Sequence, residues 1–517
     1  MSSRTIAGRL HEIATTAPDT VFVISAHSDE PRSHTYGEID ARVDRAAAQL
    51  ADLGIGADSA VHLQLANSVE FVVAVFAVNR LGGVIVPTSP ASTLDDIAYI
   101  ASHAECAVSV VDARRADVIQ AASEMAPEIR HVLTVGGDVE GLGRFEDWSG
   151  AMLSELVRPR AAADLAAVLY TSGTTGWPKG VMLTDANLQM SGEMTADLLR
   201  VRPDDRWLIT LPLFHLNALG YSLMSALSTG ASVALTDGFD PVSWSSLAAA
   251  TGATLSSLFA VHARQLLAAP QRDVDADNRL RVFVFAQHLT AAERWAIGER
   301  FGTTPVQIYG MTETIGPTIA DPLYAEQHSD TIGRALPWAT VKVVDRAGRA
   351  VADGTNGELM VHGEPGRTLM AGYFRRPEET QLVMRNGWLR TGDNMVRDAD
   401  GSFHFLGRAV EVIKPGVDNV SAPEIERVLV EHVSVLEASV VGVHNDAGDE
   451  VIVAFIALQP DDDATPDEVL EWARERLADY KVPARVIVVD ELPRNAVGKV
   501  QRRELQQRAA TALAASG

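Results

Sequence analysis

The chain has 517 residues, of which 47% are hydrophobic, and a formal net charge of −24 at pH 7. A chain of this length and apolar content can bury a large core and should divide into more than one domain. The acidic balance excludes a general nucleic-acid-binding surface or an anionic-membrane surface, because either would need a basic face.

The N-terminal half predicts a layered α/β fold. Residues 36–53 have helical periodicity and residues 61–65 form a short apolar strand, followed by a helix and by a Gly-Gly turn into a buried strand at 84–87. The same alternation continues at residues 207–211, 232–235, 254–259 and 282–285. Alternating strands and helices imply a mostly parallel sheet, so we expect a large N-terminal domain of layered parallel sheets.

The most apolar segment, residues 71–78, is flanked by Glu70 and Arg80. It is far shorter than the ~20 residues that a membrane span needs, and it predicts a core helix. The N-terminus has no hydrophobic stretch after its charges, so no signal peptide is expected. The single cysteine, Cys106, cannot form an internal disulfide. These features predict a cytoplasmic protein with no membrane partner.

The pattern changes from about residue 331. Short strands at 341–344, 357–361 and 402–405 are separated by glycines and turn residues, which predicts a small barrel. A compact α+β segment follows, and one of its helices opens with a capping box at residues 465–468. We place the domain boundary after Arg408, giving an N-terminal domain over residues 1–408 and a small, mobile C-terminal domain over residues 409–517.

Residues 170–180 read YTSGTTGWPKG and follow the apolar run 165–169, which predicts a loop at the end of a buried strand. Its glycines, among them Gly180, allow backbone N–H groups to approach phosphate oxygens, while its hydroxyls and Lys179 add donors and a positive charge. The glycine spacing excludes a Walker A loop. The composition nevertheless predicts phosphate binding.

The run resembles the phosphate-loop signature of the acyl-adenylate-forming superfamily, which includes acyl-CoA synthetases, nonribosomal adenylation domains and firefly luciferase. The resemblance implies an enzyme that binds ATP. It implies that Thr175 is one of the catalytic residues. It also implies that the nucleotide contacts come from Thr171, Ser172, Gly173, Thr174, Thr175, Gly176 and Lys179.

A second cluster lies in QIYGMTET at residues 307–314. An aromatic face, a glycine, a hydroxyl and a carboxylate there could stack on adenine, bind phosphate and hold Mg²⁺, although the pattern alone also fits an ordinary strand and turn. Beside the phosphate loop it matches the superfamily's YGxTE motif. The match implies Tyr309 at the adenine, Gly310 beside nucleotide and acid, Thr312 at the α-phosphate and Glu313 as the magnesium ligand.

A third motif, WLRTGD, ends at Asp393. A lone TGD is usually a turn with an Asx hydrogen bond. Here it resembles the family's W-x-x-TGD element, whose aspartate holds the ribose. Gly407-Arg408 matches the family's GR pair, which implies that Arg408 contacts ribose or phosphate.

The fourth motif, PRNAVGK, ends at Lys499. On its own, a lysine on such a loop is normally a solvated charge. In the family, PRxxxGK carries the catalytic lysine, which implies that role for Lys499. A desolvated ammonium there would stabilise the negative charge that develops as pyrophosphate leaves.

Three further residues concern the acid. His215, in PLFH, resembles the family histidine beside the acyl pocket and is given a catalytic and substrate-binding role, although a lone histidine is more often structural. Gln287 and His288 stand where many relatives have glycines that give an acyl chain room. They predict a small or polar acid, unless both side chains turn outward. The carnitine/crotonobetaine-type CoA ligases also lack that glycine pair, and the chain looks closest to that branch.

Two positions at which the chain differs from the family's pattern concern the second step of the family's reaction, in which CoA displaces AMP. Val410 stands at the family's hinge position, where Asp or Lys is common, and backbone dihedrals can still carry the rotation. Val417 replaces the second glycine of the GGEN element of CoA ligases and could narrow the passage for pantetheine. Adenylation is therefore better supported than thioester formation.

The predicted function is an ATP- and Mg²⁺-dependent acid–CoA ligase, with a small carboxylic acid and CoA as its partners and no nucleic acid. One alternative is an adenylating enzyme with another acceptor: a carrier protein in trans, an amine, or nitrite as in diazotising relatives. A second alternative, a non-catalytic nucleotide-binding descendant, predicts loss of Lys179, Glu313 and Lys499, yet all three are present.

Overall fold

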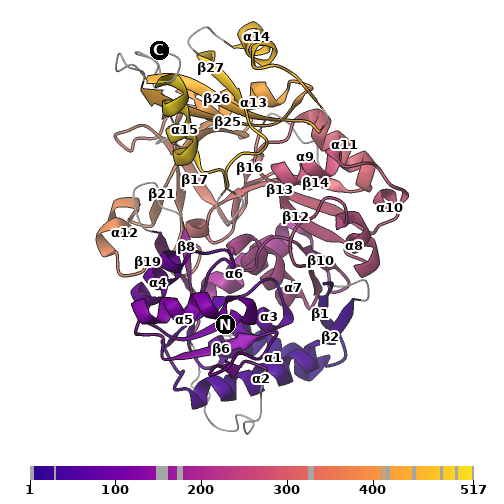
Figure 1. Cartoon of the computed structure of the whole chain (residues 1–517), viewed down its shortest axis with the longest axis vertical. Coiled ribbons are helices and arrows are strands. Elements are labelled where there is room, and N and C mark those ends of the chain that lie inside the picture. Colours follow the sequence, from indigo (N-terminus) through magenta and orange to yellow (C-terminus); the bar gives the residue numbers. More distant parts are fainter. Residues whose placement is uncertain are drawn as a thin grey trace.

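The structure is a computed structural model that describes residues 5–27, 31–146, 161–171, 178–323, 331–408, 412–413, 420–444, 450–460, 462–477, 481–494 and 499–514. Figure 1 shows the N-terminal sheets and helices in the lower part of the view and the C-terminal part, in yellow, above them. The predicted domain boundary lies beside residues 409–411, outside the described residues, and stays a prediction.

An eight-stranded sheet carries the phosphate-loop strands. Its central strands are parallel, whereas β9 runs antiparallel to β8 and β19 antiparallel to β9. Across the sheet the strands are β19 (Gly372–Tyr373), β9 (Lys179–Thr184), β8 (Leu165–Thr171), β4 (Val84–Pro87), β3 (Ala60–Gln64), β5 (Cys106–Asp112), β6 (His131–Val135) and β7 (Gly143–Arg144).

The N-terminal part also contains a nine-stranded sheet. Five neighbouring strands of it run parallel: β11, β10, β12, β13 and β14. Its order is β16 (Arg334–Ala335), β15 (Pro317–Ala320), β14 (Thr304–Gly310), β13 (Val282–Ala286), β12 (Leu255–Phe259), β10 (Arg206–Ile209), β11 (Ser232–Leu235), β1 (Val21–Ser25) and β2 (Arg32–Thr35). The predicted mixed α/β class with parallel sheets is confirmed.

Helices pack on these sheets because each presents an apolar stripe to the core. The predicted core helix is α3 (Val69–Arg80), in which every residue except Glu70 is buried and Ser68 caps the N-terminus. The others are α1 (Ile6–Thr16), α2 (Tyr36–Asp52), α4 (Leu94–His103), α5 (Ala116–Met125), α6 (Asp185–Leu199), α7 (Met224–Thr229), α8 (Trp244–Thr251), α9 (Ala260–Ala268), α10 (Asp273–Ala276), α11 (Ala291–Phe301) and α12 (Pro377–Val383), with the short helices η1 (Ala113–Arg115), η2 (Asn217–Leu223) and η3 (Thr312–Thr314).

The short strands expected as a small barrel form a five-stranded antiparallel sheet. These strands are β17 (Thr340–Val344), β18 (Gly357–His362), β20 (Met384–Arg385), β21 (Trp388–Arg397) and β22 (Phe403–Arg408). Along most of β21 buried residues alternate with partly exposed ones, so one face packs on the core while the other meets solvent.

The C-terminal part has its own apolar core, which supports the expected small α+β domain. It contains a pair of short strands and a three-stranded sheet covered by helices (Figure 1). Its elements are β23 (Val412–Ile413), β24 (Val420–Ser421), α13 (Ala422–Val430), β25 (Val435–His444), β26 (Glu450–Leu458), α14 (Pro466–Arg476), β27 (Arg485–Val488) and α15 (Arg502–Ala514). The predicted capping box is confirmed, because the Thr465 side chain and Glu468 hydrogen-bond each other's backbone N–H.

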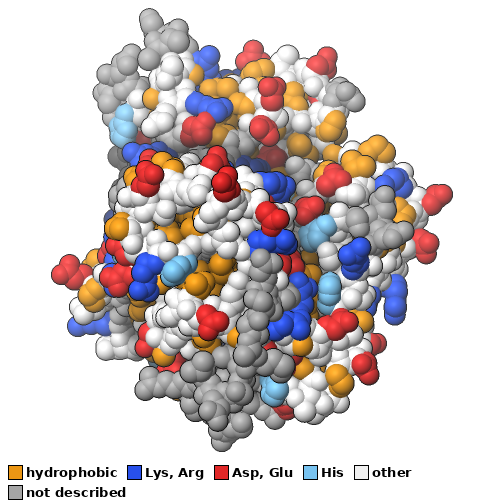
Figure 2. Space-filling view, turned by 60° about the horizontal axis from the view of Figure 1, so that its bottom comes forward, with side chains coloured by type: hydrophobic (Ala, Val, Ile, Leu, Met, Phe, Trp, Pro, Cys, Tyr) orange, Lys and Arg blue, Asp and Glu red, His pale blue; other side chains and the backbone are white. Residues whose placement is uncertain are grey.

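The surface carries charged side chains of both signs (Figure 2). Figure 2 shows acidic side chains beside basic ones on one face of the molecule. Among the described residues, the helices are all too short or too polar to cross a membrane.

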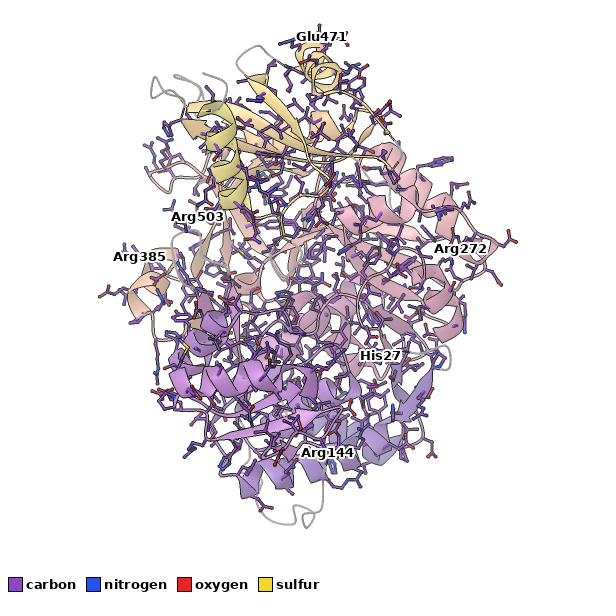
Figure 3. All side chains as sticks on the ribbon, in the orientation of Figure 1. His27, Arg144, Arg272, Arg385, Glu471 and Arg503 are labelled. Carbon is purple, nitrogen blue, oxygen red and sulfur yellow. The ribbon has the colours of Figure 1, made fainter. Side chains whose placement is uncertain are left out.

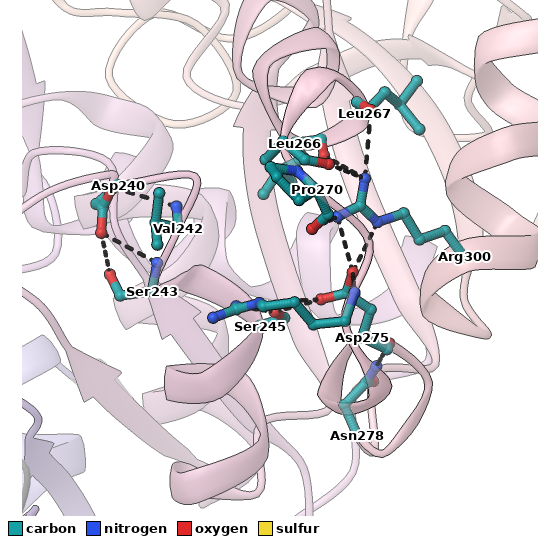
Figure 4. A network of polar contacts seen from close by, with 12 residues as sticks. Asp240, Val242, Ser243, Ser245, Leu266, Leu267, Pro270, Asp275, Asn278 and Arg300 are labelled. Carbon is teal, nitrogen blue, oxygen red and sulfur yellow. Dashed lines mark hydrogen bonds and ion pairs between the residues drawn. The ribbon is translucent and has the colours of Figure 1, made fainter.

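A buried carboxylate ties three helices of the N-terminal part together (Figure 4). Asp275 on α10 is 1% exposed and accepts hydrogen bonds from Ser245 Oγ at 2.6 Å, from the Arg272 backbone N–H at 3.0 Å and from Arg300 Nε at 2.8 Å. Burial acts to raise the pKa of Asp275, but these hydrogen bonds and the charge of Arg300 outweigh it and hold that pKa below its usual value.

Replacing Asp275 with alanine should lower the free energy of unfolding at pH 7 by about 3–5 kcal/mol, because Arg300 is left buried without its partner. A group with a lowered folded pKa stabilises above its unfolded pKa, about 3.9, and loses that effect as pH falls through the folded value. The loss measured by urea unfolding should therefore shrink below about pH 4. Asp240→Ala, a turn carboxylate at an exposed position, should cost only about 1 kcal/mol.

Candidate functional site

A cleft of about 1310 Å³ separates the N-terminal sheets from the C-terminal part. One wall comes from the ends of β12, β13 and β14 and from β21 and β22, and the other from α13, β25 and residues 499–503. Arg503, labelled in Figure 3, belongs to the second wall. Six predicted site residues line this cleft: Gln287, His288, Tyr309, Gly310, Asp393 and Lys499.

Tyr309 and Asp393 meet at one end of the cleft. The Tyr309 hydroxyl donates to Asp393 Oδ2 at 2.6 Å, and Asp393 is 4% exposed. Its backbone N–H bonds Thr391 Oγ1 at 3.1 Å, after Gly392 turns the chain with φ of +74°. A left-handed residue there favours glycine. The aromatic ring predicted to lie at the adenine and the carboxylate predicted to hold the ribose are therefore neighbours in the structure.

Arg408 lies beside this pair, since it is the cross-strand partner of Asp393 in the β21–β22 ladder. The Phe405 ring of the same strand lies 6.3 Å from the Tyr309 ring, centre to centre. Phe405 lines the cleft and was not predicted, because nothing in its local sequence sets it apart. Val410 and Val417 fall outside the described residues.

The predicted phosphate loop follows the end of the buried strand β8, where the sequence predicted it. Thr171 ends β8, Lys179 begins β9, and the two are cross-strand partners. Ser172, Gly173, Thr174, Thr175 and Gly176 lie within residues 172–177, outside the described residues.

Gly180 has a packing role that the sequence analysis missed. It lies inside β9, where a Cβ would stand 2.6 Å from Val168 Cγ1 and 3.1 Å from the Tyr170 ring. Contacts that short would force the neighbours to move. The need for glycine here therefore comes from close packing against β8.

Tyr373 connects the phosphate-loop lysine to the predicted magnesium ligand. Its hydroxyl donates to Glu313 Oε1 at 2.9 Å, and Lys179 Nζ lies 5.1 Å from its ring centre. Lys179 Nζ also lies 2.7 Å from Glu379 Oε2, and Glu379 pairs with Arg376 at 2.6 Å. Hydrogen bonds from Arg376 and Lys179 lower the pKa of Glu379. The sequence alone predicted no chemical role for Tyr373 or for Glu379.

The donor set around Glu313 suits Mg²⁺ bound with a nucleotide. Glu313 is 7% exposed, and one of its carboxylate oxygens holds the Tyr373 hydroxyl. Within the described ranges, no three His, Cys, Asp or Glu side chains are grouped as a metal site. Mg²⁺ is usually held by one or two carboxylates together with substrate phosphates and water, so a single protein carboxylate fits. Thr312 directly precedes Glu313 on η3.

His215 lies close to the charge of Lys499. Burial and then the positive charge of Lys499 lower the pKa of His215 to about 3, so its ring is neutral at pH 7. Its Nε2 is buried and has no hydrogen-bond partner among the described residues. Lys499 itself is exposed on the cleft side of the C-terminal part.

Gln287 and His288 both face the cleft. Gln287 is exposed and adopts φ of +74°, held by a hydrogen bond from Gln307 Nε2 to its carbonyl at 2.6 Å. Burial and then the charge of Arg264 lower the pKa of His288 to about 4. Both residues therefore place neutral polar groups in the cleft wall.

Comparison with known proteins gives a match along almost the whole chain. Residues 10–374 match the AMP-binding enzyme family and residues 424–499 match its C-terminal domain. The crotonobetaine/carnitine–CoA ligase of Escherichia coli is 30% identical over 495 residues, which cover 94% of this chain and 96% of the relative. The anthranilate CoA ligase AuaEII in complex with anthranoyl-AMP superposes with a TM-score of 0.90 at 25% identity, covering 99% and 98% of the two chains.

Two crystal structures of MatB from Rhodopseudomonas palustris also resemble the chain along almost its whole length. The ATP-bound form matches with a TM-score of 0.87 and the apo form with 0.76, both at 30% identity, covering 98% and 99% of this chain and 99% and 100% of MatB. The chain therefore superposes better on the ATP-bound form than on the apo form. The chain belongs to the AMP-binding enzyme family, and its enzyme class is that of the AMP-forming acid–thiol ligases.

Proposed function

We propose that the chain is an ATP- and Mg²⁺-dependent acid–CoA ligase that acts on a small or polar acid. The observation that supports this most directly is that one cleft is lined by residues from three separate motifs: Tyr309, Gly310, Asp393 and Lys499. The relatives named as CoA ligases support CoA as the acceptor. Gln287 and His288 in the cleft wall support a small or polar acid.

In the first step, a carboxylate oxygen of the acid attacks the α-phosphorus of ATP, the bond to pyrophosphate breaks, and an acyl-adenylate forms. Tyr309 and Asp393 hold adenine and ribose, while Thr312 and the phosphate loop hold the phosphates. Mg²⁺ held by Glu313 would offset phosphate charge. Lys499 stabilises the charge that develops on the transferring group, in a cleft where water screens it less than in bulk.

In the second step, the thiol sulfur of CoA attacks the acyl carbon, its proton passes to water, and the carbon–oxygen bond to AMP breaks. The mixed anhydride makes AMP a good leaving group, so two easier steps replace one difficult condensation. The division of the chain at residues 408 and 409 would let Lys499 approach for the first step and withdraw for the second.

Mass spectrometry of the products from ATP, Mg²⁺ and a panel of acids, with and without CoA, tests the proposal. An acyl-CoA formed together with AMP supports the ligase. Pyrophosphate and AMP without a thioester would instead favour a carrier protein, an amine or nitrite as the acceptor. No pyrophosphate with any acid would overturn the proposal.

Lys179 should contribute to ATP binding more than its partner Glu379 does. We expect Lys179→Ala to raise the KM for ATP at least ~10-fold, because a charge-assisted contact to phosphate is lost. Glu379→Ala should change that KM less than about fivefold, since the partly exposed Lys179–Glu379 pair is worth at most about 1 kcal/mol. Initial rates of pyrophosphate release against ATP concentration measure both, and equal effects would contradict this ranking.

A further inference from the structure

The helix η2 begins two residues after His215 and has π-helical geometry over Asn217–Leu223. π-Helical segments are rare and often occur at functional sites. A Cβ at Gly220 within η2 would collide with Ser191 Oγ on α6, so η2 is packed tightly against α6. Because of this packing, η2 cannot shift toward α6 to make room for a larger ligand on its opposite side.

Tyr221 on η2 closes the space behind Gly310. A Cβ at Gly310 would stand 3.0 Å from Tyr221 Oη and 2.6 Å from the Gly316 carbonyl oxygen. A Cβ at Gly316 would in turn stand 3.0 Å from Met194 Sδ. Tyr221 is 7% and Met194 5% exposed. Gly310 lines the cleft, so a long chain entering beside it would have to displace these buried side chains.

Three polar groups in this region have no hydrogen-bond partner among the described residues. The Tyr221 hydroxyl makes no hydrogen bond to another described residue. His215 Nε2 and Asn217 Oδ1 are buried without a hydrogen-bond partner in the described part of the chain. Buried polar groups are normally satisfied, and these three occur within seven consecutive residues of the chain. A ligand with its own donors and acceptors would satisfy them.

These groups are also uncharged. Burial raises the pKa of Tyr221 and lowers that of His215, so phenol and imidazole are both neutral at pH 7. Two arginines that line the cleft are already paired, Arg264 with Glu293 at 2.6 Å and Arg494 with Glu437. A second charge on the acid would find no free counter-charge among these pairs.

We infer that the acid is short and carries an uncharged hydroxyl, which Tyr221 recognises by a hydrogen bond while its ring limits the length of the acid. This inference rests on the proposed function. His215 and Asn217 offer further polar groups on the same segment, and Tyr221 is a specificity-determining residue. A site built to bond a hydroxyl discriminates strongly against an analogue that lacks it, because its polar groups are then left unpaired.

Pyrophosphate release measured with matched acids tests this. The probes are butanoate, its 2-, 3- and 4-hydroxy derivatives, octanoate, and the charged acids malonate and 4-(trimethylammonio)butanoate. In the unmodified enzyme we expect at least one hydroxybutanoate to exceed butanoate at least ~10-fold in kcat/KM. Octanoate and both charged acids should be the poorest substrates.

Two Tyr221 variants separate recognition from folding. Tyr221→Phe should reduce the hydroxy-to-deoxy preference at least ~5-fold, since only the hydroxyl is removed. Tyr221→Ala should raise kcat/KM for octanoate relative to butanoate. Tyr36→Phe is the matched control, because Tyr36 is buried in the core and its hydroxyl bonds the Ala231 carbonyl far from the cleft. It should leave every ratio unchanged.

The outcomes distinguish failure of the inference about the acid from failure of the proposed ligase function. Pyrophosphate release with acids but no hydroxyl preference, or an unchanged preference in Tyr221→Phe, overturns the inference and leaves the ligase intact. A preference for octanoate or for a charged acid overturns it as well. No pyrophosphate with any acid overturns the inference together with the proposed function.

Discussion

Replacing Lys499 with alanine should lower the rate of pyrophosphate release at least ~10²-fold while the affinity for ATP stays within about threefold. A group that stabilises the transition state more than the bound substrate acts on kcat and leaves binding nearly unchanged. Loss of one such contact typically costs about 10²–10³ in rate, or roughly 3–4 kcal/mol. Lys499 faces the cleft, and its charge lowers the pKa of the half-buried His215.

Isothermal titration with ATP and a coupled pyrophosphate assay measure the two quantities separately. Lys342→Ala is the matched control, because Lys342 lies on β17 over the Trp388 ring at 3.9 Å and does not line the cleft. It should change neither quantity. Unchanged pyrophosphate release in Lys499→Ala would remove the assignment of Lys499 as the catalytic lysine.

Asp393→Asn should raise the Kd for ATP at least ~30-fold and abolish the preference for ATP over 2′-deoxy-ATP and 3′-deoxy-ATP. Asparagine keeps the shape but replaces a buried carboxylate oxygen with a donor, which leaves neighbouring donors without their partner. Truncating one member of a buried, hydrogen-bonded charged pair costs about 2–5 kcal/mol. Asp393 already accepts from Tyr309 at 2.6 Å, so the adenine contact should weaken as well.

The discrimination between nucleotides is the decisive measurement for Asp393. A variant that is only misfolded would lose affinity for all three nucleotides in proportion, whereas loss of ribose recognition removes the preference itself. Asp353→Asn, an exposed carboxylate paired with Arg397, should leave the preference intact. A full preference retained in Asp393→Asn would show that another group holds the ribose.

Much of the fold could be predicted from local patterns. The core helix α3, the helix α2 and the capping box of α14 lie where the sequence places them, because apolar periodicity and cap residues act within one or two turns. The small barrel is harder to predict, since glycine-separated strands identify an antiparallel sheet without deciding its closure.

The sequence by itself determined which residues are candidates for the chemistry, because each motif is contiguous and its residue types suit contacts with phosphate, ribose and magnesium. Only the tertiary structure decided how these motifs combine. The hydrogen bond between Tyr309 and Asp393 joins residues 84 apart, and that between Tyr373 and Glu313 joins residues 60 apart. The Lys179–Glu379 pair and the Tyr221 wall behind Gly310 likewise join distant segments, and no local spacing encodes such contacts, which arise when separate strands and helices pack around one core.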